Sequence, residues 1–339
     1  MTAVAPPSRL LVLGEVLVDL LPATAGARTA LGSAGASMAL TARFGGSPAN
    51  VAVGLARLEI PVSFAGRLSR RGYGPWLRAH LDAEGVGLAA AVDAPEPCTL
   101  AVVSLDEFGV ASYEFYGPDT ADWAWQAAEL PEPAGLAGAC VHTGSLATGI
   151  QPGAGVLAGW LGRLRRQGDV AISYDPNIRP TILGDGDLDR TVVAPVLGSA
   201  HLVKVSEEDL SVLYPGRPVE EAVAGWLAGA EPGPGAGPEL VVVTGGEQGA
   251  TAWHRDGRRL SRPVPPIEVV DTVGAGDAFT AGLLASLDGQ GVLSPAGLAK
   301  LGTDELIRAI DYANRVAAVT CTRPGADPPR RAELEANAG

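Results

Sequence analysis

The chain has 339 residues, of which 47% are hydrophobic and 19% charged, and its formal net charge at pH 7 is -13. This composition predicts a compact folded protein and argues against disorder. The net negative charge repels phosphate backbones over long range, so we expect no nucleic acid partner, although local backbone dipoles can still bind a small anion.

Strands and helices are expected to alternate along most of the chain. A helix should begin at Gln151-Pro152 and end near Gly168, with arginines in its last turns. Continuous apolar runs predict strands at 10–13, 16–21, 139–142, 170–174, 202–205 and 240–244. Because strands that are apolar throughout are covered on both faces, the pattern predicts an α/β fold with a doubly wound, mostly parallel sheet flanked by helices.

Two β-rich regions depart from this alternation. Residues 99–105 and 110–116 flank a turn at 106–109 and read as a hairpin, and residues 251–262 read as a second hairpin about Asp256-Gly257. We expect the first hairpin, together with strands between about 16 and 42, to form a small β-sheet lid that excludes water. The exposed apolar edges of such a lid favour a homodimer. The segment EPGPGAGP, residues 231–238, is expected to be a surface loop.

The strongest chemical signal is IEVVDTVGAGDAFTAGLL, residues 267–284. We expect an apolar strand to end at Asp271, a glycine-containing loop to follow, and a helix to begin near Asp277. Backbone N–H groups at a helix start bind anions, and here the loop residues are Gly274, Ala275 and Gly276. Phe279 occupies the third glycine position of a dinucleotide motif, and GxxxxGK[ST] is absent from the sequence, so neither a Rossmann site nor a P-loop is expected.

Asp277 is the informative residue of this stretch. A carboxylate beside a phosphate site weakens binding unless metal ions neutralise the phosphates and the acid has a task in the reaction. In phosphoryl transfer it would accept the proton of the attacking hydroxyl, while the amides stabilise the moving phosphoryl group. The alternative is that Asp277 only caps its helix.

A second motif, GGSPANVAVGLARL at residues 45–58, places two glycines before a helix. Ser47 is expected to cap that helix, and Pro48 suits its first turn. The bare backbone at Gly45-Gly46 would let a polyhydroxylated ligand approach closely, and Asn50 offers both a donor and an acceptor. A plain capped helix entry would leave the double glycine unexplained.

Together, DTVGAGDAF and GGSPANVAVGLARL resemble the paired signatures of the ribokinase-like (PfkB) carbohydrate kinase family. The resemblance runs from about residue 10 to about residue 326. Stretches that look most like bacterial fructokinases are GEVLVDL, SLDEFGVASYEFY, TADW, DPNIRP, KVSEEDL and CTRPGA. The resemblance implies one ribokinase-like kinase domain over residues 8–328, with lid segments at about 16–42 and 98–118 inserted in it and terminal tails at 1–7 and 329–339.

The resemblance also implies roles for individual residues. Asp277 would be the catalytic base, and Gly274, Ala275 and Gly276 the anion hole. The sugar would be held by Asp19, Gly45, Gly46, Asn50 and Arg179. The nucleotide would be held by Lys204, Thr244, Gly246, Gly249 and Asn314. Asp209 would help to hold Mg²⁺, and Asp271 would help to hold a monovalent cation such as K⁺.

Two of these positions need comment. The NxxE element of the family appears here as Ser206-Glu207-Glu208-Asp209, so a shorter carboxylate would have to reach the waters of Mg²⁺. Arg179 would contact a phosphate or an acid substrate, or else be a structural arginine in a salt bridge.

The implied function is an ATP-dependent sugar kinase of the cytoplasm, since no apolar run approaches the roughly 20 residues of a membrane span. Fructose is the expected substrate, with fructose 6-phosphate as product and ATP, Mg²⁺ and K⁺ as cofactors. The alternatives are a 2-keto-3-deoxygluconate kinase, another sugar or nucleoside kinase, a silent binding protein and a structural protein. A substrate panel separates the kinases, and stabilisation by ligands separates binding proteins from structural ones.

Overall fold

The structure is a computed structural model that describes residues 9–22, 39–105, 111–117, 119–184, 186–229 and 237–336. The turn expected at 106–109, most of the loop expected at 231–238, and residues 1–7 of the terminal tails lie outside the described residues.

The central sheet has eight strands in the order β14-β13-β12-β11-β10-β9-β1-β4. From β12 to β4 all neighbouring strands are parallel, and β13 and β14 add an antiparallel hairpin at one edge. The bounds are β1 Leu10–Leu13, β4 Val62–Ala65, β9 Cys140–Gly144, β10 Ala171–Asp175, β11 Leu202–Ser206, β12 Leu240–Thr244, β13 Ala250–His254 and β14 Arg259–Arg262. This confirms the predicted doubly wound, mostly parallel sheet and the second hairpin.

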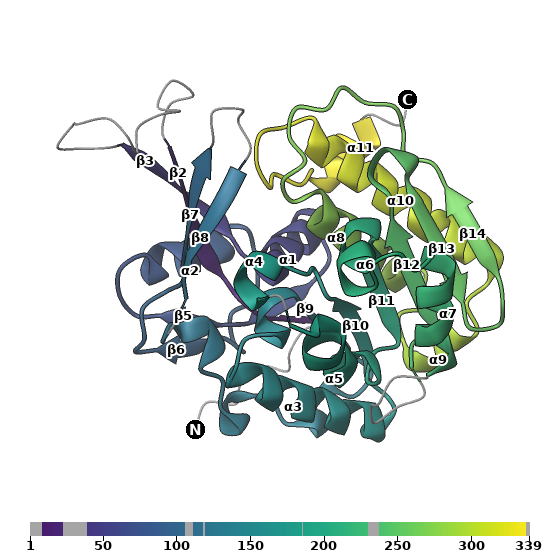
Figure 1. Cartoon of the computed structure of the whole chain (residues 1–339), viewed down its shortest axis with the longest axis horizontal. Coiled ribbons are helices and arrows are strands. Elements are labelled where there is room, and N and C mark those ends of the chain that lie inside the picture. Colours follow the sequence, from purple (N-terminus) through teal and green to yellow (C-terminus); the bar gives the residue numbers. More distant parts are fainter. Residues whose placement is uncertain are drawn as a thin grey trace.

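Helices cover both faces of this sheet (Figure 1). Leu10 and Val12 of β1 lie in one hydrophobic core with residues of α1, α8 and α10, whereas Leu11 and Leu13 lie in the other with residues of α3, α5 and α7. Alternate side chains of one strand therefore enter two cores, which is why the strand is apolar throughout. The bounds are α1 Ser47–Arg57, α2 Gly74–Ala83, α3 Gly153–Gln167, α4 Pro180–Leu183, α5 Ala194–Leu197, α6 Glu207–Leu213, α7 Val219–Ala228, α8 Ala275–Gly289, α9 Pro295–Ala299, α10 Thr303–Cys321 and α11 Arg331–Ala336.

A separate four-stranded sheet, here called the lid sheet, stands beside the central sheet (Figure 1). Its order is β3-β2-β7-β8, with β2 Leu17–Pro22, β3 Leu40–Gly45, β7 Leu100–Leu105 and β8 Ala111–Tyr116. β7 and β8 form the predicted hairpin, and β2 pairs in parallel with β7 and antiparallel with β3. A two-stranded sheet joins β5 Arg67–Ser69 to β6 Val92–Ala94. The predicted combination of the hairpin with strands from 16–42 is confirmed.

The expected strand that ends at Asp271 is wrong. Residues 263–269 have no regular secondary structure, and the side chains of Val269 and Val270 are 48% and 59% exposed. The N–H groups of Val270 and Asp271 donate to a single acceptor, the Cys321 carbonyl oxygen, at 2.8 and 3.2 Å. This apolar run therefore crosses the surface from the edge strand β14 to α8 without joining a sheet.

Candidate active site

The two sequence motifs meet at the carboxylate of Asp277, in the first turn of α8. Oδ1 accepts a hydrogen bond from Ser47 Oγ at 2.6 Å, and Oδ2 accepts one from Asn50 Nδ2 at 2.8 Å. Ser47 lies 230 positions before Asp277 in the sequence. The predicted anion loop at the start of α8 and the predicted sugar-binding segment, residues 45–50 and here called the sugar loop, are therefore neighbours in space.

These contacts correct one local prediction and exclude one alternative. Ser47 does not cap α1, because Gly46 occupies the N-cap position and the Ser47 hydroxyl is directed to Asp277. Asp277 does not cap α8 either, since Gly274 is the N-cap residue there and no side chain caps that helix. Pro48 lies in the first turn of α1 as predicted.

The environment of Asp277 makes it more basic than an exposed aspartate. Burial raises the pKa of its carboxyl, and the charge of Asp175 raises it further, whereas the hydrogen bonds from Ser47 and Asn50 and the charge of Lys204 lower it. A raised pKa increases the proton affinity of the carboxylate, which suits a general base near neutral pH.

The anion loop is held tightly at the start of α8. Gly274 has a φ of +77°, and a Cβ there would lie 2.5 Å from the Cβ of Ala326. The N–H of Ala275 donates to the Thr272 carbonyl oxygen at 3.1 Å. The expectation that this amide is free to bind an anion is therefore wrong. The amides of Gly276 and Asp277 follow in the first turn, where a helix has no acceptor of its own. They form the positive end of the helix dipole, which favours a bound anion.

A buried cation lies behind this loop. A Cβ on Gly276 would be 3.0 Å from Lys204 Nζ, which donates to Asp175 Oδ2 at 3.0 Å. Thr280 Oγ1 donates to the Gly276 carbonyl oxygen at 3.1 Å and lies 3.5 Å from Asp175 Oδ2. Neither Asp175 nor Thr280 was among the site residues predicted from the sequence. Asp175 could have been predicted, because it ends the strand β10 and ligands bind at the carboxyl ends of the strands in sheets of this kind.

The double glycine is required by close contacts. A Cβ on Gly45 would lie 2.5 Å from Asp19 Oδ2, and a Cβ on Gly46, where φ is +102°, would lie 2.6 Å from the Glu15 carbonyl oxygen. Asp19 pairs across the lid sheet with Arg43. Burial raises the pKa of Asp19 to about 6, although the charge of Arg43 lowers it. The predicted sugar residues Asp19, Gly45, Gly46 and Asn50 therefore lie together.

Arg179 precedes α4 and is exposed. Its Nη1 donates to the Ile178 carbonyl oxygen at 2.9 Å. Within the described residues it forms no ion pair, so this part of the chain does not support a salt-bridged structural arginine.

The two acids predicted for metal ions already accept hydrogen bonds. Asp209 Oδ1 accepts from the Ile178 N–H at 2.8 Å, and Oδ2 accepts from the N–H and hydroxyl of Ser206 at 3.2 and 2.7 Å. Asp271 accepts from the N–H groups of Val273 and Gly325 at 3.0 and 2.7 Å. Each acid thus has a structural task, and a role toward metal ions stays a prediction.

The residues predicted for the nucleotide surround the turn after β12. Thr244 ends that strand, and Gly246 and Gly249 lie in the turn that follows. A Cβ on Gly249 would lie 2.2 Å from the Arg262 carbonyl oxygen. Asn314 Nδ2 donates to that same oxygen at 3.2 Å and to the Pro263 carbonyl oxygen at 3.1 Å. Gly249 and Asn314 therefore share a neighbour, whereas the Lys204 side chain contacts Gly276 and Asp175.

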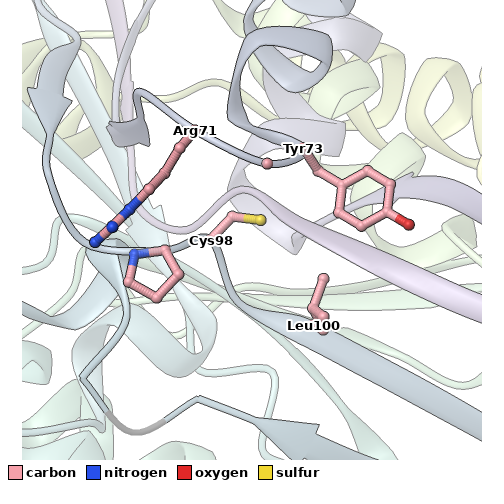
Figure 2. A pocket seen from close by; sticks show the side chains of 6 residues that line it. Arg71, Tyr73, Cys98 and Leu100 are labelled. Atoms are coloured by element: carbon pink, nitrogen blue, oxygen red, sulfur yellow. The ribbon is translucent and has the colours of Figure 1, made fainter.

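A cavity of about 460 Å³ opens beside the start of β7. Figure 2 shows its lining, which comprises Arg71, Gly72, Tyr73, Pro97, Cys98 and Leu100. Ala101 is the register partner of Asp19, and side chains alternate along a strand, so Leu100 faces away from Asp19. This cavity therefore lies on the opposite face of the lid sheet from the predicted sugar residues.

Three buried histidines contact neighbouring polar groups. His142 contacts Ser173 Oγ, His201 Nδ1 accepts from the Ile172 N–H, and His254 contacts the Leu298 carbonyl oxygen. Within the described ranges, three or more His, Cys, Asp or Glu side chains nowhere gather so that they could hold a metal ion. A helix long and apolar enough to span a membrane is also missing from those ranges.

Comparisons with known proteins agree with this geometry. The model of the pfkB family carbohydrate kinases matches residues 7–332. The chain is 35% identical to a fructokinase of Klebsiella pneumoniae over 294 residues, which is 86% of this chain and 88% of that protein. It is 33% identical to fructokinase-1 of rice over 323 residues, which is 95% of this chain and 94% of that protein.

Two solved structures are similar over nearly their whole length. A fructokinase from Xylella fastidiosa with bound ATP has a TM-score of 0.83 and 25% identity, covering 97% of this chain and 99% of that one. A fructokinase double mutant from Vibrio cholerae, bound to fructose, ADP and potassium ion, has a TM-score of 0.80 and 28% identity, covering 98% of each chain.

Proposed function

Because the chain belongs to the pfkB family of carbohydrate kinases, we propose that it is an ATP-dependent fructokinase. It transfers the γ-phosphoryl group of ATP to the primary C6 hydroxyl of fructose, which gives fructose 6-phosphate and ADP. The observation that carries the proposal is the carboxylate of Asp277, which bonds to Ser47 and Asn50 of the sugar loop from the first turn of the anion-binding helix.

Each residue of the site has a task in this reaction. Fructose lies against Gly45, Gly46 and Asn50, and the Asp19 carboxylate accepts a hydrogen bond from a sugar hydroxyl. The carboxylate of Asp277 accepts the proton of the C6 hydroxyl as its oxygen bonds to the γ-phosphorus and the bond to the ADP oxygen breaks. The free amides at the start of α8, with Lys204 behind them, stabilise the charge on the transferred phosphoryl group.

The adenine nucleotide is proposed to lie beside Thr244, Gly246, Gly249 and Asn314. A divalent cation, proposed to be Mg²⁺, neutralises charge on the phosphates and keeps most of its own waters. The residues fit such an ion, because Asp175 Oδ1 is buried and lacks a hydrogen-bond partner in the described part of the chain, so it could hold a metal-bound water. We propose a monovalent cation near Asp271, as potassium is present in one similar fructokinase.

An assay of ADP release on a substrate panel tests the proposal. Purified protein with ATP and a divalent cation should turn over fructose, and potassium should raise the rate. Asp277→Asn is the control for contaminating kinases. Turnover of 2-keto-3-deoxygluconate with none of fructose would overturn the assignment.

A second candidate, a 2-keto-3-deoxygluconate kinase, is favoured by Arg179, an exposed arginine without an ion pair in the described ranges. A guanidinium of this kind suits a substrate carboxylate. Arg179→Gln should raise KM for the keto-deoxy acid at least about tenfold if that acid is the substrate, and change KM for fructose little if fructose is.

We also propose a cytoplasmic homodimer that pairs through the lid sheets. Leu40 and Tyr116, which are 38% and 52% exposed, lie at the two edges of the lid sheet on the face opposite Asp19. Light scattering during size exclusion should give twice the mass of the chain, and a monomer at all concentrations would contradict this.

A further inference from the structure

Asp122 lies in the TADW segment, which the proposed function leaves without a role. It belongs to the 3-10 turn Ala121–Trp123 just below the lid sheet. The residue is 1% exposed, and it forms no ion pair with the described residues. A buried carboxyl group without a cation needs hydrogen bonds to compensate for the loss of water.

Its hydrogen bonds join the chain segments that enter and leave the lid sheet. Oδ1 accepts from the Val16 N–H at 2.9 Å, just before β2, and Oδ2 accepts from Thr99 Oγ1 at 2.7 Å, just before β7. The carbonyl oxygen of Thr99 accepts from the Val18 N–H at 3.1 Å. Thr120, which follows β8, lies 2.6 Å from Thr99 between their hydroxyl oxygens. The segments that lead into β2 and β7 and out of β8, here called the root of the lid sheet, are therefore all linked to the Asp122 side chain.

A count of hydrogens shows which form of Asp122 completes this chain. Thr120 Oγ1 donates to the Gly117 carbonyl oxygen at 2.7 Å, so its only hydrogen is used. Thr99 has one hydrogen for two close contacts, with Thr120 Oγ1 and Asp122 Oδ2. If Asp122 is ionised, one of the three contacts lacks a proton. If Asp122 carries a proton on Oδ2, this group donates to Thr99 Oγ1, and Thr99 Oγ1 donates to Thr120 Oγ1. All three contacts then have a hydrogen.

Burial brings the titration of the Asp122 carboxyl group closer to neutral pH. It raises the pKa of Asp122 to about 6, although the hydrogen bonds from Thr99 and Val16 lower it. Burial also raises the pKa of Glu15 to about 7, and the charge of Asp122 raises it further. Burial and the charge of Asp122 also raise the pKa of the nearby Cys98 thiol. No cation of the described residues faces Asp122 closely enough to form an ion pair.

The anchored segment touches the predicted sugar loop. A Cβ on Gly46 would lie 3.0 Å from the Cα of Val16, whose N–H is held by Asp122. Gly46 leads directly to Ser47 and Asn50, which bind the Asp277 carboxylate. A shift at Val16 would therefore displace the residues that hold the sugar.

We propose that Asp122 is a positioning residue that fixes the root of the lid sheet against the sugar loop, through a hydrogen-bond chain that is complete when its carboxyl group is uncharged. The inference rests on the proposed function for its kinetic consequence only, because the anchoring of Val16 can be measured without substrate.

Two variants separate anchoring from charge. Asp122→Asn can accept from the Val16 N–H and donate to Thr99 Oγ1, so it supplies the missing hydrogen and should leave KM for fructose within about twofold of the parent. Asp122→Ala removes both bonds and should raise KM for fructose at least about tenfold, with kcat at saturating fructose within about threefold.

Amide hydrogen exchange gives the second readout. Exchange at Val16 and Val18 should speed up at least about tenfold in Asp122→Ala and stay parental in Asp122→Asn. Parental KM and exchange in Asp122→Ala, or equal damage in both variants, would overturn the inference. If the parent fails to phosphorylate fructose, the proposed function fails, and the exchange result still decides whether Asp122 anchors the lid sheet.

Discussion

Replacing Asp277 by asparagine tests the assigned base without disturbing its surroundings. In the variant, the side-chain oxygen can accept from Asn50 Nδ2, and the new amide can donate to Ser47 Oγ, so both contacts of the parent are kept. The variant loses only the ability to take a proton. A positioned general base contributes about 10²–10⁴ in rate, so kcat should fall at least about 10²-fold.

The stability of the same variant should not fall. Because burial raises the pKa of Asp277 in the folded state, the protonated form stabilises the fold at low pH, and this contribution is lost as pH rises through the folded-state pKa. At pH 7 an uncharged amide therefore suits the site at least as well as the carboxylate. The thermal unfolding midpoint of Asp277→Asn at pH 7 should equal or exceed that of the parent.

Coupled ADP-release kinetics and thermal unfolding of the same preparation check both parts. A rate within a few-fold of the parent would refute the role of Asp277 as base. A large loss of rate together with a lower unfolding midpoint would refute the reasoning about the buried carboxylate, because the damage would then be structural.

Three further outcomes follow from the same geometry. Ser47→Ala removes a hydrogen-bond donor that lowers the pKa of Asp277. The acid limb of the plot of kcat against pH should therefore move to higher pH, and kcat should fall about tenfold. An acid limb at the parental pH would contradict this. Gly274→Ala meets both a φ of +77° and the Ala326 side chain, so it should lose roughly 1–3 kcal/mol of unfolding free energy and most activity. The control Gly168→Ala, at φ +89° with no atom within 4 Å, should lose about 1 kcal/mol and keep parental kinetics. Asp19 has a pKa raised to about 6, so KM for fructose should rise as pH falls through 6 and an anionic acceptor is lost; a flat profile from about pH 5 to 8 would count against it.

The central sheet could be predicted because its strands are buried on both faces. All residues of β1, β9 and β10 are buried; β1 is apolar throughout, and β9 and β10 begin with apolar residues before their polar residues His142 and Asp175. The run before Asp271 is also largely apolar, yet it pairs with no strand in the described part of the chain. Composition shows that a segment can form a strand, whereas pairing depends on what lies beside it in space.

The site could be predicted as a set of residues but not as a set of bonds. The contact between Ser47 and Asp277 depends on how α1 packs against α8, where a Cβ on Gly54 would lie 2.8 Å from the Cβ of Ala281. The sequence shows small residues at these positions but not that they face one another. For the same reason Ser47 was expected to cap its own helix, and Asp175 was not singled out.

A structure of the protein with fructose and ADP–aluminium fluoride, a mimic of the transferring phosphoryl group, tests the central claim most directly. The C6 hydroxyl should lie within about 3 Å of an Asp277 carboxylate oxygen, and the fluoride group should lie on the amides of Gly276 and Asp277. A C6 hydroxyl bound to another side chain, or a fluoride group away from the start of α8, would contradict it.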